Sequence, residues 1–207
     1  MRLNVGATRM ELLRLKRRLL VARRGHKLLK DKQEQLMRKI LELIREIKGA
    51  REKITPELTE INEKFFWAQT YGMAADYDEV LASAARKIEL ELGAHSIVNI
   101  NVPMINKLDL TGPIINYNYI LTSGELDIAL IRLNNILPAL INLVITEKTL
   151  ELMAEELERT RRRVNALEYV LIPSLEETIR YINMKLAEVE RGNLVRLMRI
   201  KEIIRGS

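Results

Sequence analysis

The sequence predicts a mainly α-helical protein in which long N- and C-terminal helices pair as an antiparallel two-helix coiled coil, with a small insert between them. The chain of 207 residues is 47% hydrophobic and 30% charged but only 4% aromatic, a composition typical of long helices. Apolar residues recur every three or four positions near both ends, whereas the middle of the chain loses this period. We therefore expect three parts: residues 1–71, 72–121 and 122–207.

The N-terminal part, residues 1–71, reads as one coiled-coil helix. Thr8 and Glu11 form a capping box, in which Thr8 accepts from first-turn amides and Glu11 reaches back to the cap. Thr55 and Pro56 then read as a new cap with proline at the first helical position, so we expect a kink near 55–56 and continuation towards Tyr71. Eleven of thirteen seam positions are apolar; they are Leu12, Leu15, Leu19, Ala22, His26, Leu29, Gln33, Leu36, Ile40, Leu43, Ile47, Ala50 and Ile54.

The middle part, residues 72–121, predicts a short helix followed by a β-hairpin. Helical spacing covers residues 76–92 and Gly93 closes it. Apolar and polar residues then alternate over residues 98–102 and again over 115–119. Pro103 and the pair Gly112 and Pro113 separate these two predicted strands.

The C-terminal part, residues 122–207, begins with a second capping box, Thr122 to Glu125, and then shows helical spacing to the end. Three successive steps of four, from Leu167 to Ile179, break the heptad like a stutter, and Pro173 predicts a bend. The seam is Leu150, Met153, Leu157, Thr160, Val164, Leu167, Leu171, Leu175, Ile179, Ile182, Leu186, Val189, Asn193, Leu197, Ile200 and Ile204. Folding back on residues 8–54 would bring both chain ends together.

Most catalytic chemistry is excluded by what the sequence lacks. It has no cysteine and only two histidines, His26 and His95, so thiol, zinc and Ser-His sites are not expected. The nine glycines are too widely spaced for a nucleotide-binding loop. We therefore predict no catalytic residue, metal or cofactor. We also expect no signal peptide and no membrane-spanning segment, because no apolar run reaches the required length uninterrupted.

The charge is uneven along the chain. Residues 1–53 carry +11, residues 54–146 carry −6 and residues 147–207 carry +1. A basic coiled-coil protein that binds nucleic acid is one alternative that this charge suggests. A self-associating parallel coiled-coil scaffold is another. No aromatic residues interleave with the basic segment, so a stacking platform for bases is missing.

Three features of the sequence each allow two interpretations. His26 and Gln33 in the seam either fix the register of the coiled coil or contact a partner. The run Arg161, Arg162 and Arg163 is either a solvated face balanced by nearby glutamates or a docking surface for an acidic partner. Residues 65–67, Phe-Phe-Trp, either pack against the insert or form a hot spot for another protein of an assembly.

Two longer runs make the sequence resemble a known family. The first is Ala7-Thr8-Arg9, then Leu15-Lys16, then Arg24-Gly25-His26-Lys27-Leu28-Leu29-Lys30-Asp31-Lys32. The second is Thr160-Arg161-Arg162-Arg163-Val164-Asn165-Ala166-Leu167-Glu168-Tyr169, followed by Ile172-Pro173 and Thr178-Ile179-Arg180-Tyr181-Ile182. In this order and separation they resemble the D subunit of the vacuolar-type and archaeal-type rotary ATPases.

The resemblance implies a non-catalytic central rotor shaft that transmits torque between an ATP-hydrolysing or ATP-synthesising head and an ion-translocating membrane ring. The end with both termini would sit in the head, a hexamer of A and B subunits, and the other end on the funnel-shaped C or d subunit. The small F subunit would bind the side of the shaft. The protein would be cytoplasmic and peripheral to the membrane, with no nucleic acid and no direct membrane insertion.

The resemblance also suggests which residues form interfaces. The expected signature and interface residues are Arg24, Gly25, His26, Lys27, Lys30, Asp31, Lys32, Arg161, Arg162, Arg163, Asn165, Glu168 and Pro173. From the charge map we further expect Arg14, Arg17, Arg18, Arg196 and Arg199 to act as an electrostatic bearing inside the head.

Overall fold

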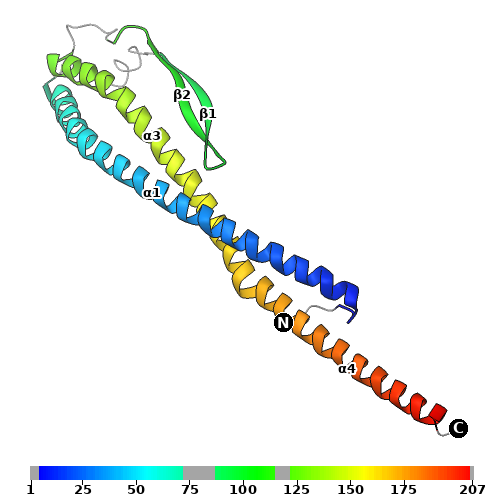
Figure 1. Cartoon of the computed structure of the whole chain (residues 1–207). Helices are drawn as coiled ribbons and strands as arrows, with labels where there is room; N and C mark the ends of the chain where they lie inside the picture. Colours follow the sequence, from blue (N-terminus) through cyan, green and yellow to red (C-terminus); the bar gives the residue numbers. More distant parts are fainter. Residues whose placement is uncertain (1–4, 72–86, 115–121, 206–207) are drawn as a thin grey trace. The chain divides into compact units, whose positions relative to one another are not determined.

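The computed structural model describes residues 5–71, 87–114 and 122–205, and it confirms the mainly helical fold class. In sequence, two long helical segments flank a two-stranded antiparallel hairpin (Figure 1). In chain order the elements are α1 (Arg9–Tyr71), β1 (Lys87–Ile97), β2 (Ile100–Thr111), α3 (Gly124–Asn165), the π-helix η1 (Ala166–Leu171) and α4 (Ile172–Arg205).

The described chain divides into two compact units, each containing part of α1 and part of the C-terminal helices. Unit 1 consists of Met1–Gln35 and Leu157–Ser207, and unit 2 consists of Leu36–Glu156. The division crosses α1 and α3 rather than following the ends of the helices. Each unit has its own pairing of helices and its own small core.

Unit 1 pairs the start of α1 with η1 and α4 in antiparallel order. Its buried core is small and aliphatic, as expected for a seam one side chain deep; it comprises Leu15, Ala22, Leu175 and Ile182. Arg9 pairs with Glu190 and Arg23 pairs with Glu176, both at 2.6 Å. Because the residue numbers rise on one helix as they fall on the other, the two helices run in opposite directions.

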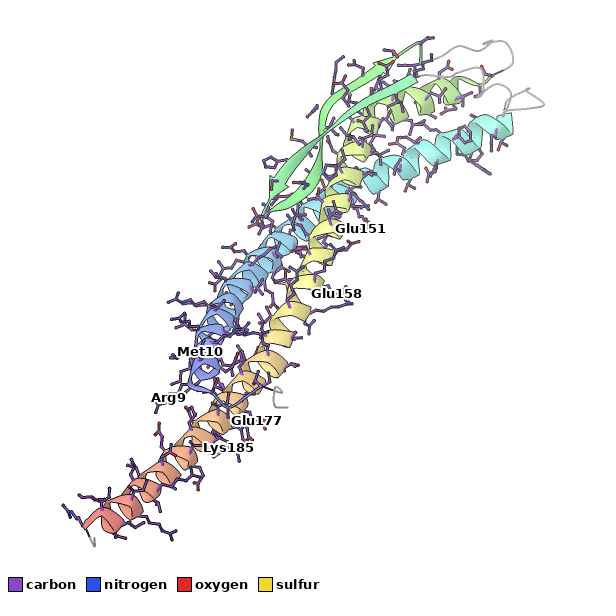
Figure 2. The ribbon with its side chains drawn as sticks, turned by 90° about the vertical axis from the view of Figure 1, so that its right-hand side faces the viewer. Arg9, Met10, Glu151, Glu158, Glu177 and Lys185 are labelled. Carbon is purple, nitrogen blue, oxygen red and sulfur yellow. The ribbon has the colours of Figure 1, made fainter. Side chains whose placement is uncertain are left out.

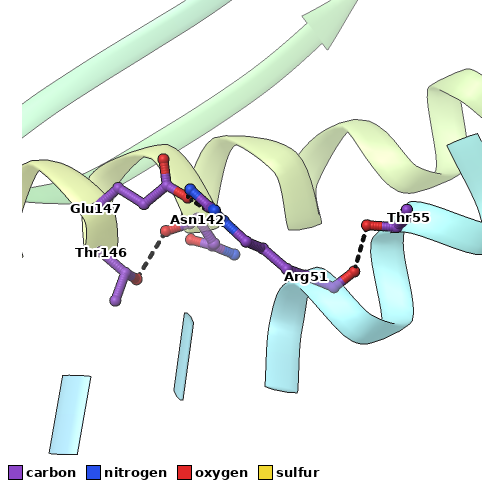
Figure 3. Close-up of polar contacts among 5 residues, drawn as sticks. All are labelled: Arg51, Thr55, Asn142, Thr146 and Glu147. Atoms are coloured by element: carbon purple, nitrogen blue, oxygen red, sulfur yellow. Dashed lines mark hydrogen bonds and ion pairs between the residues drawn. The ribbon is translucent and has the colours of Figure 1, made fainter. Parts of the chain in front are cut away.

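Unit 2 repeats this antiparallel pairing between the second half of α1 and α3. Its core consists of Ile54, Ile61, Ala129 and Ile136. Arg51 Nη2 lies 2.6 Å from Glu147 Oε1 (Figure 3), and Lys64 Nζ lies 3.0 Å from Glu125 Oε2. The antiparallel two-helix arrangement predicted from the seams is therefore present in both units.

The N-terminal caps of the two long helices agree only partly with the predicted capping boxes. The Glu11 amide donates to Thr8 Oγ1 at 3.3 Å, so Thr8 caps α1 as expected. The Glu11 carboxylate does not complete the box; it accepts from Arg14 at 3.2 Å, while the Thr8 amide donates to the Gly6 carbonyl. At the start of α3 the amide of Glu125 donates to Ser123 Oγ. Ser123, not Thr122, is therefore the residue that caps this helix.

The prediction that Thr55 begins a new helical segment is wrong, although continuation to Tyr71 is confirmed. α1 passes through Pro56 without interruption. The Thr55 hydroxyl donates backwards to the Arg51 carbonyl at 2.7 Å (Figure 3), which is the bonding of a mid-helix threonine. Because Pro56 lacks an amide hydrogen, it cannot donate the backbone hydrogen bond that other residues of α1 make to the carbonyl four residues earlier.

The hairpin exists, but its strands differ from those expected. Residues 87–92, expected to close a helix, lie in β1, and Gly93 lies in the same strand instead of capping a helix. A Cβ at Gly93 would lie 2.5 Å from Asn106 Oδ1, so glycine here makes room for a neighbouring side chain. Residues 76–86 and 115–119 of the predicted helix and second strand lie outside the described residues.

The turn of the hairpin falls at Val98 and Asn99, with φ of 52° and 63°. Ile97 pairs with Ile100 on either side, which makes a two-residue loop with both residues left-handed. Val98 was expected to begin a strand and instead occupies a conformation that β-branched residues rarely adopt. Pro103, expected between strands, lies within β2 opposite Ala94.

The predicted break around Pro173 takes the form of a π-helix. η1 covers Ala166–Leu171, and the Ile172 amide donates to the Leu167 carbonyl, five residues back. Pro173 has no amide to donate and its ring crowds the preceding turn, so the wider turn lies just before it. The sequence predicted a bend at Pro173, whereas the structure shows a π-helix just before this residue, which the sequence did not predict.

One helical stretch, Gly124–Arg205, contains an 18-residue window with a mean hydropathy of 1.8. By length and composition alone it could cross a membrane, which differs from the expectation that no segment qualifies. That expectation required an uninterrupted apolar run, whereas an average tolerates Asn134, Asn135 and Pro138. Within unit 2, Ala129 and Ile136 of this stretch pack against α1, and Arg132 pairs with Glu60 of α1.

Candidate functional site

In the described residues, the candidate functional features are surfaces of paired helices. Among residues 5–71, 87–114 and 122–205, no group of three or more His, Cys, Asp or Glu side chains is arranged to hold a metal. The hollows are open grooves along paired helices. One of about 730 Å³ lies between α1 and α3 in unit 2, above small residues such as Gly49, Ala50 and Ala139.

The α1 seam is covered along its whole predicted length. None of its thirteen positions is exposed, and Leu36 is fully buried. The periodic pattern therefore identified the buried face of α1 correctly. Burial of such aliphatic side chains contributes about 1.5–3 kcal/mol each when complete.

The second seam is covered only as far as Leu186. From Val189 onwards its positions are exposed, and Leu197 and Ile204 are 62% and 70% exposed. The physical reason lies in the length of the partner helix: α1 begins at Arg9, and Arg9 pairs with Glu190. We call the helical segment from Arg191 to Arg205 the α4 extension.

The α4 extension combines exposed aliphatic and basic side chains. Its large exposed aliphatic residues are Leu194, Val195, Leu197, Met198, Ile200, Ile203 and Ile204. Arg196 and Arg199 are exposed among them, and neither has an ion-pair partner within the described chain. Charged side chains such as Lys185 project from α4 just before this segment (Figure 2). A helical segment with so many exposed apolar side chains is typical of a surface that another protein covers.

The other predicted bearing residues lie on the outer side of α1 in unit 1. Arg14, Arg17 and Arg18 are all exposed. Arg14 pairs with Glu11 in the same turn at 3.2 Å, whereas Arg17 and Arg18 have no carboxylate partner among the described residues. The structure therefore leaves most of this positive charge available for an external partner.

One polar contact joins His26 of the first signature run to Glu168 of the second. His26 Nε2 lies 3.3 Å from Glu168 Oε2, and the His26 side chain is 22% exposed. Glu168 belongs to η1, so the π-turn carries the carboxylate that faces α1. This contact favours the register interpretation for His26, because the half-buried imidazole in the seam reaches Glu168 only in one alignment of the two helices.

The remaining signature residues mostly face outwards. Arg162 bonds Glu158 one turn earlier on α3, as the solvated-face interpretation of the arginine run expects. Apolar residues of the two runs share the core of unit 1, where Leu15 of the first run packs in one cluster with Ile182 and Ile179 of the second. The exposed signature residues are Arg24, Lys27, Lys30, Asp31, Arg161, Arg162, Arg163, Asn165, Glu168 and Pro173, while Gly25 and Lys32 are half-buried.

The buried hydroxyl groups that lie in the seam or directly beside it were not singled out from the sequence. Thr178 is 1% exposed and donates to the Ser174 carbonyl at 2.6 Å, and Ser174 donates to the Leu171 carbonyl at 2.9 Å. Thr160 is fully buried, and its Oγ1 has no hydrogen-bond partner within the described part of the chain. The sequence did indicate the buried hydroxyl of Thr160, because this residue occupies a heptad position where an aliphatic residue is expected.

Two ion pairs shift the pKa of exposed groups. The hydrogen bond from Lys39, and then its positive charge, lowers the pKa of Glu42 below its ordinary value, and the same pairing raises the pKa of Lys39. The hydrogen bond to Glu151 likewise raises the pKa of Lys148. Both pairs join residues three apart on one helix, so they reflect surface pairing rather than a catalytic environment.

The aromatic run at the end of α1 is largely exposed. Phe66 and Trp67 are 61% and 47% exposed, and their ring centroids lie 5.8 Å apart in an edge-to-face arrangement. Phe65 is half-buried and Ala68 fully buried. This exposure favours the hot-spot interpretation over packing against the insert.

Comparison with known proteins adds independent findings. The family described as the ATP synthase D subunit matches residues 11–202. The chain is 44% identical over 205 residues to the V-type ATP synthase D subunit of Acetivibrio thermocellus, covering 98% of this chain and 92% of that protein. It is 46% identical to the proteins of the same name from Clostridium novyi and Enterococcus faecalis, covering 98% of this chain and 96% and 97% of theirs.

Proposed function

The chain belongs to the family of ATP synthase D subunits, and from this premise we propose how its surfaces serve a rotary motor. It is a central stalk subunit of a V/A-type ATPase, part of a membrane-associated ATP synthase complex. The relatives' names give no support to the nucleic-acid-binding or scaffold alternatives. The proposal concerns the role of the protein in that complex, its partners and its residues.

The protein acts as a non-catalytic shaft that transmits torque between the head and the ion-translocating ring. Its own chemistry is packing: paired helices whose α1 seam is aliphatic at eleven of thirteen positions resist twisting, because any rotation of one helix exposes buried side chains. Exposed ion pairs such as Arg23 with Glu176 and Arg51 with Glu147 add about 0.2–1 kcal/mol each. Their larger contribution is to fix the alignment of the two helices.

The head, a hexamer of A and B subunits, holds the α4 extension and the basic start of α1. The observation that carries this assignment is the exposed aliphatic and basic face beyond Glu190. An apolar sleeve around it would exclude water without directional bonds, and a shaft that must turn needs contacts of this kind. Attraction between Arg17, Arg18, Arg196 or Arg199 and acidic head residues would centre the shaft without fixing its angle.

The other partners are the small F subunit on the side of the shaft and the funnel-shaped C or d subunit towards the membrane ring. The chain itself is cytoplasmic and peripheral to the membrane. The ion pair of Arg132 with Glu60 supports this placement, because a paired, partly exposed arginine beside the apolar stretch of α3 is costly inside a lipid bilayer.

Co-purification tests the proposal. The full-length chain, co-expressed with its head subunits, the F subunit and the funnel-shaped subunit, should assemble with one copy per hexameric head. A double variant with Leu197 and Ile200 replaced by glutamate leaves the covered part of the seam intact. The double variant should lose the head while retaining the F subunit. A wild-type chain that binds neither the head nor the F subunit would overturn the proposed function.

A further inference from the structure

The surface feature that the shaft role leaves unused is the outer edge of the β-hairpin. Nine of the eleven residues of β1 are exposed, whereas β2 is exposed at only five of its twelve positions. The sheet has two strands in the described part of the chain, so no third strand there satisfies the backbone amides and carbonyls on the outer edge of β1. Such an edge is a template on which an extended segment of another protein can add as a further strand.

The register shows which backbone groups of β1 point outwards. Ile97 and Ile100 flank the two-residue turn, and such a pair exchanges its hydrogen bonds across the hairpin. The extra residue of the bulge, Asn106, lies on β2, so the alternation along β1 is unbroken. The β1 residues whose amides and carbonyls face away from β2 are therefore Ile88, Leu90, Leu92, Ala94 and Ser96.

The two edges of the hairpin are not equivalent. Pro103 lies opposite Ala94, at a position where its nitrogen faces away from β1, and proline has no amide hydrogen to offer there. The bulge at Asn106 interrupts the edge of β2 a second time. β1 contains neither a proline nor an extra residue. An added strand therefore finds a regular edge only on β1.

One face of β1 is aliphatic and incompletely covered. Ile88, Leu90 and Leu92 are 51%, 40% and 58% exposed. The residues opposite them on β2 are also aliphatic, and these are half-buried. Exposure of apolar side chains therefore rises towards the outer edge of β1. Aliphatic side chains of a third strand would cover this part of the face.

The other face of β1 carries negative charge that the hairpin does not neutralise. Glu89 and Glu91 are exposed, and neither has an ion-pair partner among residues 5–71, 87–114 and 122–205. Lys107 lies opposite Glu91 but pairs with Asp109 of its own strand. Basic side chains of an added strand would meet both free carboxylates, whereas acidic side chains would be repelled.

We infer that the β1 edge binds an extended segment of another protein in which aliphatic and basic residues alternate. Its backbone bonds to the outward groups of Leu90 and Leu92, and the alternation places its aliphatic and basic side chains on opposite faces. A second copy of the chain is a poor partner, because overlapping two β1 strands would bring Glu89 and Glu91 of both copies together. The inference uses the hairpin alone, so it does not depend on the shaft role.

Amide exchange measured by NMR on the full-length, nitrogen-15-labelled chain tests the added strand. The probe is the peptide Lys-Val-Lys-Ile-Lys-Val-Lys with blocked ends. It should slow exchange of the outward amides of Leu90 and Leu92 about tenfold. The amides of Glu89 and Glu91 already face β2 and should change little. Binding without this alternation would overturn strand addition, because attraction between charges alone does not select every second amide.

Two modified peptides separate the backbone from the charge. Methylating the backbone nitrogens of the valines and the isoleucine removes the amides that would face β1 and keeps the positive charge. This peptide should bind at least about tenfold more weakly. A peptide with glutamate in place of every lysine should not bind. Equal binding by the methylated peptide would show that the backbone edge is not used, and binding of the glutamate peptide would contradict the assigned charge.

Substitutions in the chain test the same contacts. Glu89→Gln with Glu91→Gln should weaken binding of the lysine peptide about fivefold. The matched control, Glu46→Gln with Glu57→Gln, removes two exposed carboxylates of α1 in the same unit and should bind like the wild type. Ala94→Pro removes an outward amide of the edge and should also weaken binding, while circular dichroism shows unchanged helix content. Equal affinities of the two double variants, or no binding of the lysine peptide by the wild type, would overturn the inference and leave the shaft role standing.

Discussion

Arg9 Nη2 lies 2.6 Å from Glu190 Oε1, and this ion pair joins the first residue of α1 to α4. Beyond it α4 continues to Arg205 without a partner helix among the described residues, over roughly 22 Å at 1.5 Å per residue. The pair therefore separates a covered part of the seam from the α4 extension.

The covered seam should carry the stability of unit 1. Leu175 is fully buried in the cluster with Leu15, Ala22 and Ile182, so Leu175→Ala should lower the free energy of unfolding by about 2–5 kcal/mol through lost burial and the remaining cavity. Leu194→Ala, at a position 56% exposed, should change it by less than about 0.5 kcal/mol. Urea unfolding followed by circular dichroism measures both. Equal losses of unfolding free energy in the two variants would show that the side chains of the α4 extension are also buried in the free chain.

The hairpin turn should improve with residues that tolerate positive φ. Val98 and Asn99 both adopt left-handed conformations, which cost a non-glycine residue about 1–2 kcal/mol. The double change Val98→Asn with Asn99→Gly should raise the protection of β1 and β2 amides against hydrogen exchange about fivefold. Ser96→Gly, a glycine placed within the strand, should lower it. Reduced protection in the double variant would contradict the observed turn.

The ion pair of Lys39 with Glu42 should shift the pKa of both groups. Lys39 Nζ donates to Glu42 Oε2 at 2.8 Å, and this hydrogen bond lowers the pKa of Glu42 and raises the pKa of Lys39. A lowered carboxyl pKa stabilises the fold above the ordinary pKa of glutamate, and this contribution disappears as the pH falls through the lowered value. On the basic side it is lost as the pH rises through the raised pKa of Lys39.

Carbon-13 NMR of the Glu42 carboxyl measures this effect directly. Lys39→Met should return the pKa of Glu42 towards its ordinary value, because both the hydrogen bond and the positive charge are removed. Lys53→Met, on the same helix but without a role in this pair, serves as the control. If the pKa of Glu42 were unaffected by Lys39→Met, the hydrogen bond would not be its cause.

Removing the positive charge of the bearing should weaken head binding mainly at low salt. We expect the variant with Arg14, Arg17, Arg18 and Lys30 replaced by glutamine to bind the head less tightly than the wild type in dilute buffer. The difference should shrink as salt screens the charges. A control with Arg38, Arg45, Lys48 and Lys53 replaced removes the same formal charge from unit 2. Equal weakening by both sets would indicate a general charge effect and no bearing.

The buried helix faces were predictable because they depend on local periodicity. Each α1 seam position, from Leu12 to Ile54, is fixed by spacing along one helix. An aliphatic residue at that spacing is most stable when it is buried in the interface with the partner helix. The antiparallel pairing followed from having two such seams in one chain. The bend expected at Pro173 rests on equally local grounds, because proline removes one amide wherever it lies.

The features that were misread depend on partners distant in sequence. Ile88, Leu90 and Leu92 alternate as a strand does, but the same residues also fit a helical spacing, and only pairing with β2 decides between them. The left-handed turn at Val98 is likewise imposed by the strands on either side. The exposure of Trp67 and the contact of His26 with Glu168 require the fold, because no local pattern specifies which outward residues meet.

The most direct test asks whether the head covers the α4 extension. The chain contains no cysteine, so Leu197→Cys, at a position 62% exposed, introduces a single thiol, and Ile88→Cys in the hairpin provides a control at a position 51% exposed. Both thiols should react with a maleimide at similar rates in the free chain. After assembly with the head hexamer, the account predicts strong protection at position 197 and unchanged labelling at position 88. Undiminished labelling at position 197 in the assembled complex would contradict it.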